Sequence, residues 1–168
     1  MYSPLWGSAL DWTSINGELA GLVSENAPTL GPAIRAAQEV RQAMERLIPV
    51  WEQLCAATYA QCKDNCCTAQ RVWFEFRDLL LFHLLGLAIP PGQTRAVLNA
   101  PCRYLTPRGC GLPRLTRPWR CSWYLCQDQV DLLATRPPRE QRRVSRLLGS
   151  ILENRESMEL SFRAALGY

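Results

Sequence analysis

The clearest hydrophobic pattern in this chain begins after residue 31 and leads toward the first cysteines. Apolar side chains recur there at every third or fourth position, namely Ile34, Ala37, Val40, Met44, Leu47, Ile48, Trp51, Leu54 and Cys55. This spacing places them on one face of an α-helix. Gly31 suits the N-cap of that helix and Pro32 its first position. We therefore predict a helix over residues 32–62 that is kinked or split at Pro49, whose ring crowds the preceding turn.

Three further segments also predict helices. The stretch RVWFEFRDLLLFHLLG, from Arg71 to Gly86, is apolar nearly all round, as is typical of a helix in the middle of a core. Gly86 provides a natural C-terminal stop. Residues 127–134 predict a short helix, and residues 138–165 predict a long one with an imperfect apolar stripe. The chain should thus contain a central helix followed by C-terminal helices.

The rest of the chain has no usable period. Residues 1–31 are rich in turn residues and are expected to form an arm or loose cap. A short helix could form near residues 94–98. Residues 101–126 combine Pro, Gly, Arg and Cys, which predicts a folded but irregular loop. Since no strand pattern appears, the expected fold class is mainly α, a small helical domain with an irregular Cys-rich loop closed by a metal centre.

Length and composition indicate one ordinary globular domain. At 168 residues, with 48% hydrophobic and 20% charged side chains, the chain can bury a core without covalent staples. We expect one domain with an arm, a kinked helix, a cysteine-cluster region around the central helix, and C-terminal helices, over residues 1–31, 32–62, 62–126 and 127–168. The net charge of +4 is modest and gives little support for a nucleic-acid partner.

The predicted location is the cytoplasm. The N-terminus has neither a basic segment nor an apolar segment of the kind that marks a secretory signal. The most apolar run, Leu79 to Ile89, is about half of the ~20 residues that a membrane span requires. In a reducing compartment, cysteine clusters bind metals or do redox chemistry more often than they form permanent disulfides.

The cysteines form two groups, one near the end of the first predicted helix and one in the irregular loop. The eight are Cys55, Cys62, Cys66, Cys67, Cys102, Cys110, Cys121 and Cys126. Thiolates are suited to Zn²⁺ or to Fe–S clusters, and four of them complete either site. With one histidine in the chain, such a site must consist mostly of sulfur. Metal bonds shared by the two groups would order the loop and close it onto the helix.

Two points about these cysteines stay open. A disulfide between Cys66 and Cys67 would be strained. The two thiols either bind one metal together or face different neighbours. Cys55 lies on the apolar helix face, where a buried core thiol is the first interpretation and a metal ligand the second. A disulfide framework for the whole set is the alternative to metal.

The motif CKDNCC, followed by PCRYLTPRGCGLPRLTRPWRC, resembles the YkgJ-like family of small cysteine-cluster proteins, described as zinc- or iron-chelating domains of the CxxCxxCC type. The resemblance covers about residues 62–126. This chain departs from the family pattern in the Cys-x3-Cys-Cys spacing of its opening run, in Ser122, where the family often has Arg, and in the additional Cys126. The resemblance implies a metal site made from these cysteines.

We predict an Fe–S cluster, most simply [4Fe–4S], with Zn as the second choice, because dispersed ligands and an adjacent pair do not look like paired zinc knuckles. Arg117 or Arg120 would offset the negative charge of the cluster. The predicted ligands are Cys62, Cys66, Cys67, Cys102, Cys110, Cys121 and Cys126, with Cys55 behind them. The role could be structural, redox or metal handling.

No catalytic residue is predicted. Similar cysteine clusters are linked with flagellin lysine methylation, but the chain has no Gly-rich loop for a methyl donor, so an enzyme is the less favoured alternative. His83 predicts a core or boundary histidine. Glu75 and Asp78 predict a salt-bridged helix face with Arg71, and Glu75 is a weak candidate for a supporting group near the metal.

Charge on the last predicted helix suggests a further role. RPPREQRRVSR carries five arginines near its start, where positive charge is unfavourable. This segment is either solvated charge or a surface for a protein partner. Glu159 and Arg163 predict a favourable i,i+4 pair on the same helix.

Overall fold

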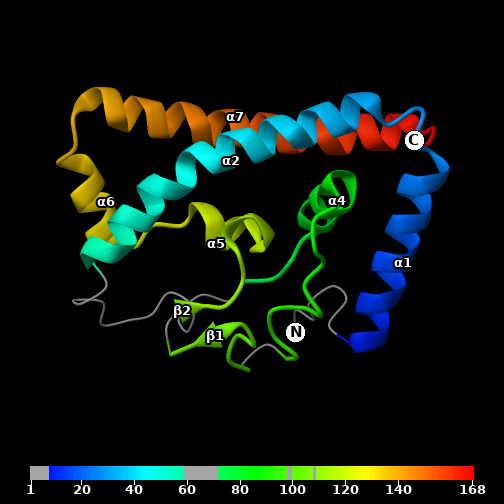
Figure 1. Ribbon diagram of the computed structural model, residues 1–168, viewed down its shortest axis with the longest axis horizontal. Coiled ribbons are helices and arrows are strands. Elements are labelled where there is room, and N and C mark those ends of the chain that lie inside the picture. The colour runs from blue at the N-terminus through cyan, green and yellow to red at the C-terminus, as the bar shows by residue number, and fades with distance from the viewer. Residues whose placement is uncertain (1–7, 59–71, 98–99, 108) are drawn as a thin grey trace.

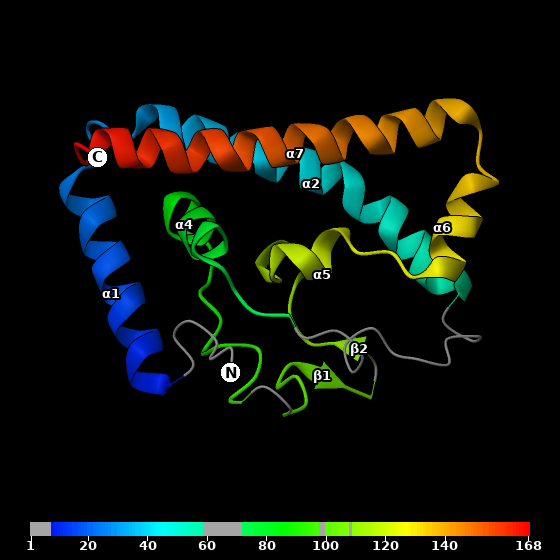
Figure 2. The same cartoon turned by 180° about the vertical axis from the view of Figure 1, so that it is seen from behind.

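Two long helices, α2 (Gly31–Thr58) and α7 (Pro138–Ala165), form the spine of the fold in the computed structural model, which describes residues 8–58, 72–97, 100–107 and 109–168 (Figure 1). Figures 1 and 2 both show the two helices side by side and running in opposite directions. The other elements are α1 (Ala9–Glu25), α4 (Phe76–Leu85), β1 (Leu105–Thr106), β2 (Gly109–Cys110), the 3-10 helix η2 (Arg114–Thr116), α5 (Trp119–Trp123) and α6 (Gln127–Ala134). The prediction of a mainly α fold is confirmed.

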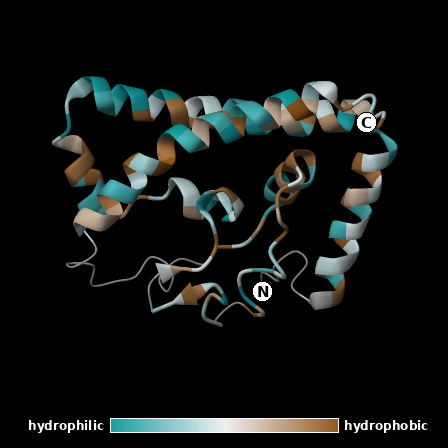
Figure 3. Ribbon diagram, viewed as in Figure 1, coloured by the Kyte–Doolittle hydropathy of each residue, from teal (hydrophilic) through white to brown (hydrophobic). Residues whose placement is uncertain are grey.

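The predicted apolar face of α2 is buried. Most of the stripe is in the core, and alanines beside it let the backbones of neighbouring helices approach; the buried apolar residues of α2 are Ala33, Ala36, Ala37, Val40, Ala43, Met44, Leu47, Trp51 and Leu54. From α7, Val144, Ile151, Met158 and Phe162 enter the same core. Figure 3 shows the first turns of α7 as hydrophilic, in contrast to the largely hydrophobic α4.

Helix α2 runs through Pro49 as one element. Pro49 therefore does not split the helix, although Figure 1 shows that the second half of α2 turns away from α7 and toward α6. The helix is described as far as Thr58, and the predicted end at residue 62 lies outside the described residues. This bend carries Cys55 away from the spine and toward the loop.

The N-terminal prediction was wrong, because residues 9–25 form a helix rather than a loose arm. The Ser8 hydroxyl caps it by accepting the amide of Asp11 at 3.0 Å. Trp12 and Leu19 are buried in the core, and the Trp12 indole donates to the carbonyl of Pro90 at 2.9 Å. Tertiary burial of one face outweighs the low helix propensity of the glycines in this segment.

The central helix begins at Phe76, five residues later than predicted. Glu75 is the N-cap, and its amide donates to the carboxylate of Asp78 at 3.0 Å. Residues 72–75 are not helical, and the Gln93 side chain binds both backbone groups of Phe74. Gly86 ends the helix at φ 60°, as predicted, and the residues from 79 to 82 are all buried.

The Cys-rich segment is more regular than predicted. Its strands β1 and β2 pair in antiparallel fashion, with Leu105 opposite Cys110, and η2 and α5 follow. Residues 94–97 form no helix, contrary to prediction; Thr94 is buried, and its carbonyl accepts the amide of Arg103 at 2.8 Å. The predicted helices at residues 127–134 and 138–165 are confirmed as α6 and α7.

Candidate metal centre

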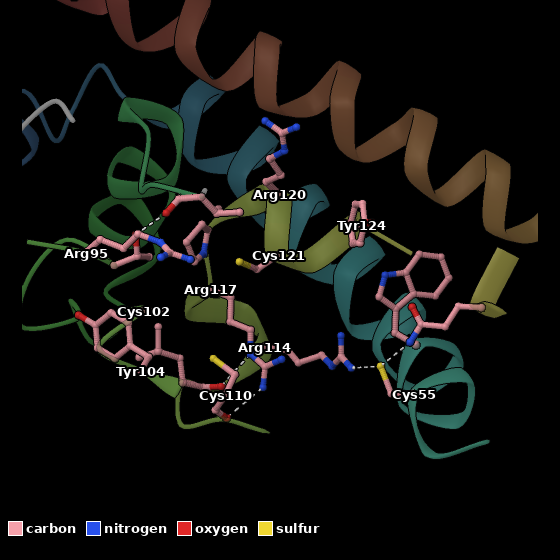
Figure 4. Close-up of a pocket in the computed structure, with 16 residues that line it drawn as sticks. Cys55, Arg95, Cys102, Tyr104, Cys110, Arg114, Arg117, Arg120, Cys121 and Tyr124 are labelled. Carbon is pink, nitrogen blue, oxygen red and sulfur yellow. Dashed lines mark hydrogen bonds between the residues drawn. The ribbon is translucent and has the colours of Figure 1, made fainter. Parts of the chain in front are cut away.

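A cavity of about 100 Å³ lies between α2, α5 and the β1–β2 hairpin, and cysteines from four separate places in the chain line it (Figure 4). Cys55 comes from the last turns of α2, Cys102 precedes the hairpin, Cys110 lies on β2 and Cys121 lies on α5. All four are partly buried, and no disulfide joins two described cysteines. The fold therefore brings Cys55 of the first group to the same cavity as three cysteines of the second group.

A buried ion pair positions α5, which carries Cys121. Asp78 of α4 accepts hydrogen bonds at one carboxylate oxygen from Arg155 of α7 at 2.8 Å and from the Trp119 amide at 3.1 Å. The side chains of Arg155 and Asp78 are 3% and 2% exposed. The Arg155 guanidinium also lies 5.3 Å from the centroid of the Trp119 ring, a cation–π contact. Three helices thus meet at one carboxylate where α5 begins.

The environment predicted for Asp78, a salt-bridged polar helix face, was wrong, because its side chain is buried against Arg155, a residue 77 positions away. Burial raises the pKa of Asp78, while the positive charge of Arg155 and the hydrogen bonds to the carboxylate oppose that rise. Arg71 lies outside the described residues.

Two nitrogen donors reach the sulfur of Cys55. Arg114 Nη2 lies 3.4 Å from Cys55 Sγ, and Gln129 Nε2 of α6 lies 3.1 Å from it. The other end of the Gln129 amide accepts the backbone N–H of Cys126 at 3.2 Å. Figure 4 shows Arg114 extending toward Cys55 across the lower part of the cavity. Hydrogen bonds of this kind stabilise a sulfur that carries negative charge, as in a metal thiolate.

The cavity wall is positively charged. Arg95, Arg114, Arg117 and Arg120 line it, and no Asp or Glu of the described ranges does. Arg117 donates to two carbonyls of the loop, from Nε to Leu112 at 2.9 Å and from Nη2 to Cys110 at 3.4 Å. These bonds hold the guanidinium in place without neutralising it. The buried Trp51 side chain also lines the cavity, and its indole N–H donates to no described acceptor.

Tyr104 joins the loop to the preceding segment. Its hydroxyl donates to the carbonyl of Gly92 at 2.6 Å, and its ring packs edge-on against Phe74. Burial raises the pKa of Tyr104, so the phenol stays neutral and acts as a donor. This contact holds β1 against the residues that precede Arg95.

The other predicted site residues either lie outside the described part of the chain or do not line the cavity. Cys62, Cys66 and Cys67 lie outside the described residues. Cys126 is the N-cap of α6 and is not among the residues lining the cavity. Glu75 is exposed at the start of α4 and does not line the cavity either.

His83 is a boundary histidine, as expected. Its Nε2 lies 2.9 Å from Asn16 Oδ1, and burial lowers its pKa. The pair joins α4 to α1, away from the cavity, so His83 adds no nitrogen ligand to the thiols. The sequence prediction did not include Arg114, Gln129 and Trp51, since their places at the site depend on folding that brings residues 51–55 against 114–129.

The donor chemistry fits a thiolate-bound metal, but the spacing of the described donors does not complete a site. Within the described part of the chain, no three Cys, His, Asp or Glu side chains come close enough together to hold a metal ion. Soft sulfur donors suit zinc and iron, and hydrogen bonds such as those to Cys55 Sγ are the kind that support a metal-bound thiolate.

No protein-family model, curated protein or solved structure matches the chain. The resemblance to the YkgJ-like family therefore stays a prediction. None of the described helices combines the length and the apolar character that crossing a membrane would demand.

Proposed function

We propose that this protein binds a metal through its cysteines in the cavity between α2, α5 and the hairpin. The observation that carries the proposal is the convergence of Cys55, Cys102, Cys110 and Cys121 on one cavity, although they span 66 positions of the chain. Cytoplasmic thiols gathered in this way are typical of metal or redox sites. Cys126, at the start of α6, becomes the weakest of the predicted loop ligands on this arrangement.

An Fe–S cluster, most simply [4Fe–4S], is our first choice and Zn²⁺ our second. A cluster held by thiolates carries net negative charge, and hydrogen bonds to sulfur and nearby charges set its potential. The donors Arg114 and Gln129 on Cys55 and the guanidinium of Arg117 supply both effects. The role that follows is structural, redox or metal handling.

The sequence contributes three further ligand candidates. Helix α2 is described up to Thr58, three residues after Cys55, and the described chain resumes at Val72, which lines the cavity. Cys62, Cys66 and Cys67 fall between these two points. We therefore keep them in the proposed ligand set, and their contribution is decided by substitution.

The test is elemental analysis of protein purified without oxygen, together with thiol titration. Iron with equimolar sulfide and a brown colour supports the cluster, whereas a colourless protein with stoichiometric zinc selects Zn²⁺. Cys66→Ser, Cys110→Ser and Cys121→Ser should each lower the metal content, and Cys126→Ser, at the weakest of the candidate ligands, should lower it least. Metal-free protein whose thiols all react would contradict the proposal, and metal-free protein without reactive thiols would select the disulfide alternative.

A protein-interaction role is the second candidate, supported by the surface of α7. Arg139, Arg142, Arg143 and Arg146 are exposed at three- and four-residue spacing, and none forms an ion pair with a described residue. Such a stripe suits an acidic protein surface. Replacing the four by Gln should abolish salt-sensitive co-purification of an acidic partner and leave the metal content unchanged. Retained co-purification would exclude this stripe as the contact.

A further inference from the structure

We infer that the cavity also binds small molecules that carry a carboxylate or phosphate group, with Arg114 and Arg117 as the partners of the anion. This inference goes beyond the metal proposal, because it concerns the protein without metal. It rests on three properties of the cavity: the positive charge of Arg114 and Arg117, which no described Asp or Glu neutralises, an unused buried donor, and its size.

The charge is the first argument. Arg114 donates to the sulfur of Cys55, and Arg117 donates to the carbonyls of Leu112 and Cys110. Neither forms an ion pair with a described residue, and both are partly buried. A partly buried charge is stabilised when an opposite charge takes the place of lost water. The planar guanidinium fork matches the two oxygens of a carboxylate or phosphate.

The second argument is the indole of Trp51. This side chain is 2% exposed, and its N–H donates to no described acceptor. Buried donors are nearly always paired in folded proteins, so an orphan beside a cavity indicates an acceptor that enters with a ligand. Trp51 lies one helical turn before Cys55 and shares the cavity wall with both arginines.

The third argument is size and lining. The cavity measures about 100 Å³, and an apolar cavity of about 150 Å³ accommodates benzene. The space thus suits an oxyanion group with a small apolar extension rather than a large cofactor. Leu112, Tyr104 and Tyr124 provide the apolar part of the wall. This combination of a few polar groups with an apolar wall is typical of small-molecule sites.

The experiment follows the indole ¹⁵N–H resonance of Trp51 in reduced, chelator-treated full-length protein, with Trp51→Phe used to assign the peak. Inorganic phosphate and sodium acetate are titrated separately against sodium chloride of equal ionic strength. A saturable shift with either anion, and none with chloride, is expected. A response to acetate alone assigns carboxylate ligands, and a response to phosphate alone assigns phosphate ligands.

Variants that keep the positive charge but remove the planar guanidinium test whether the anion is bound at two points. Arg114→Lys and Arg117→Lys should each weaken anion binding by about tenfold, since a point charge replaces a bidentate partner. Arg139→Lys is the matched control, because this side chain is exposed on α7 and does not line the cavity. Its affinity should stay within about twofold of the parent. Should Arg117→Lys disturb folding, seen by circular dichroism, Arg114→Lys decides alone, because its described bond goes to a side chain.

The outcomes separate this inference from the metal proposal. A peak that does not move in either titration, an equal shift with chloride, or an equal loss of affinity in Arg139→Lys overturns the anion site. Metal binding without anion binding overturns this inference and leaves the metal proposal standing. Anion binding by a protein that never retains metal supports the inference and contradicts the metal proposal.

Discussion

Replacing Asp78 by Asn tests whether the buried pair with Arg155 holds the site together. The substitution keeps the shape of the side chain but removes the charge that compensates a guanidinium only 3% exposed. Breaking a buried pair from one side costs about 3–5 kcal/mol in free energy of unfolding. For a chain of this length each kcal/mol lowers the melting temperature by about 2–4 °C, so a drop of about 6–20 °C is expected.

The matched control is an exposed pair of the same charge type. Arg41 and Glu45 on α2 lie 2.8 Å apart with side chains 48% and 46% exposed. Exposed i,i+4 pairs contribute about 0.3–0.5 kcal/mol, so Glu45→Gln should leave the melting temperature nearly unchanged. Both variants are measured by thermal and urea denaturation with circular dichroism, after coincident transitions by two probes have confirmed two-state behaviour.

A double-variant cycle separates the pair from its surroundings. Arg155→Met also leaves one partner alone, but Asp78→Asn with Arg155→Met removes both charges. The double variant should lose about 2 kcal/mol less free energy of unfolding than the sum of the losses in the two single variants. If Asp78→Asn costs less than about 1 kcal/mol, or if the two losses simply add, the ion pair does not stabilise this junction and the reasoning fails.

Three shorter predictions concern other contacts. Burial raises the pKa of Glu159, but hydrogen bonds and charges from Arg77 and Arg163 outweigh it and lower the pKa below 4.5. The stabilisation of the folded state is present above pH 4.5 and is lost as the pH falls through the lower pKa of the folded state. Glu159→Gln should therefore flatten the acid limb of a stability-against-pH curve, and an unchanged limb would contradict this. Gly86→Ala should cost about 1 kcal/mol in urea unfolding, because the helix ends there at φ 60°, and a stabilised variant would exclude that strain. Gln93→Leu should cost about 3 kcal/mol by leaving the buried Phe74 and Thr94 amides unpaired, with a neutral result showing that other acceptors replace it.

The sequence predicted the elements whose pattern is local and strong. The stripe of α2 and the boundaries of α6 and α7 required only apolar periodicity and helix punctuation. Predictions failed where tertiary burial decides the structure. The face of α1 is apolar enough to bury Trp12 and Leu19, yet the intervening Asn16 and Gly17 indicated turns. In these segments the contacts made in the folded protein, rather than local helix propensity, determined the structure.

The candidate site also combines features that the sequence predicts with features that depend on tertiary contacts. The cysteines were the candidate site residues that the sequence predicted, and the expectation that the loop returns to the end of the first long helix agrees with the cavity that Cys55 and Cys110 share. The partners of Asp78 and Cys55 could not be predicted, because Arg155 is 77 positions and Gln129 is 74 positions away. Such contacts depend on how α6 and α7 fold back along α2, and a local sequence pattern does not predict this arrangement.

Hydrogen bonds within the protein hold the Cys-rich loop in place. Gln93 binds the backbone of Phe74, the Tyr104 hydroxyl donates to Gly92, and Arg117 donates to the carbonyls of Leu112 and Cys110. These bonds connect the loop to itself and to the segment before α4, and each has a backbone group as one partner. A metal bound as proposed by Cys102, Cys110 and Cys121 would add to these bonds in ordering the loop.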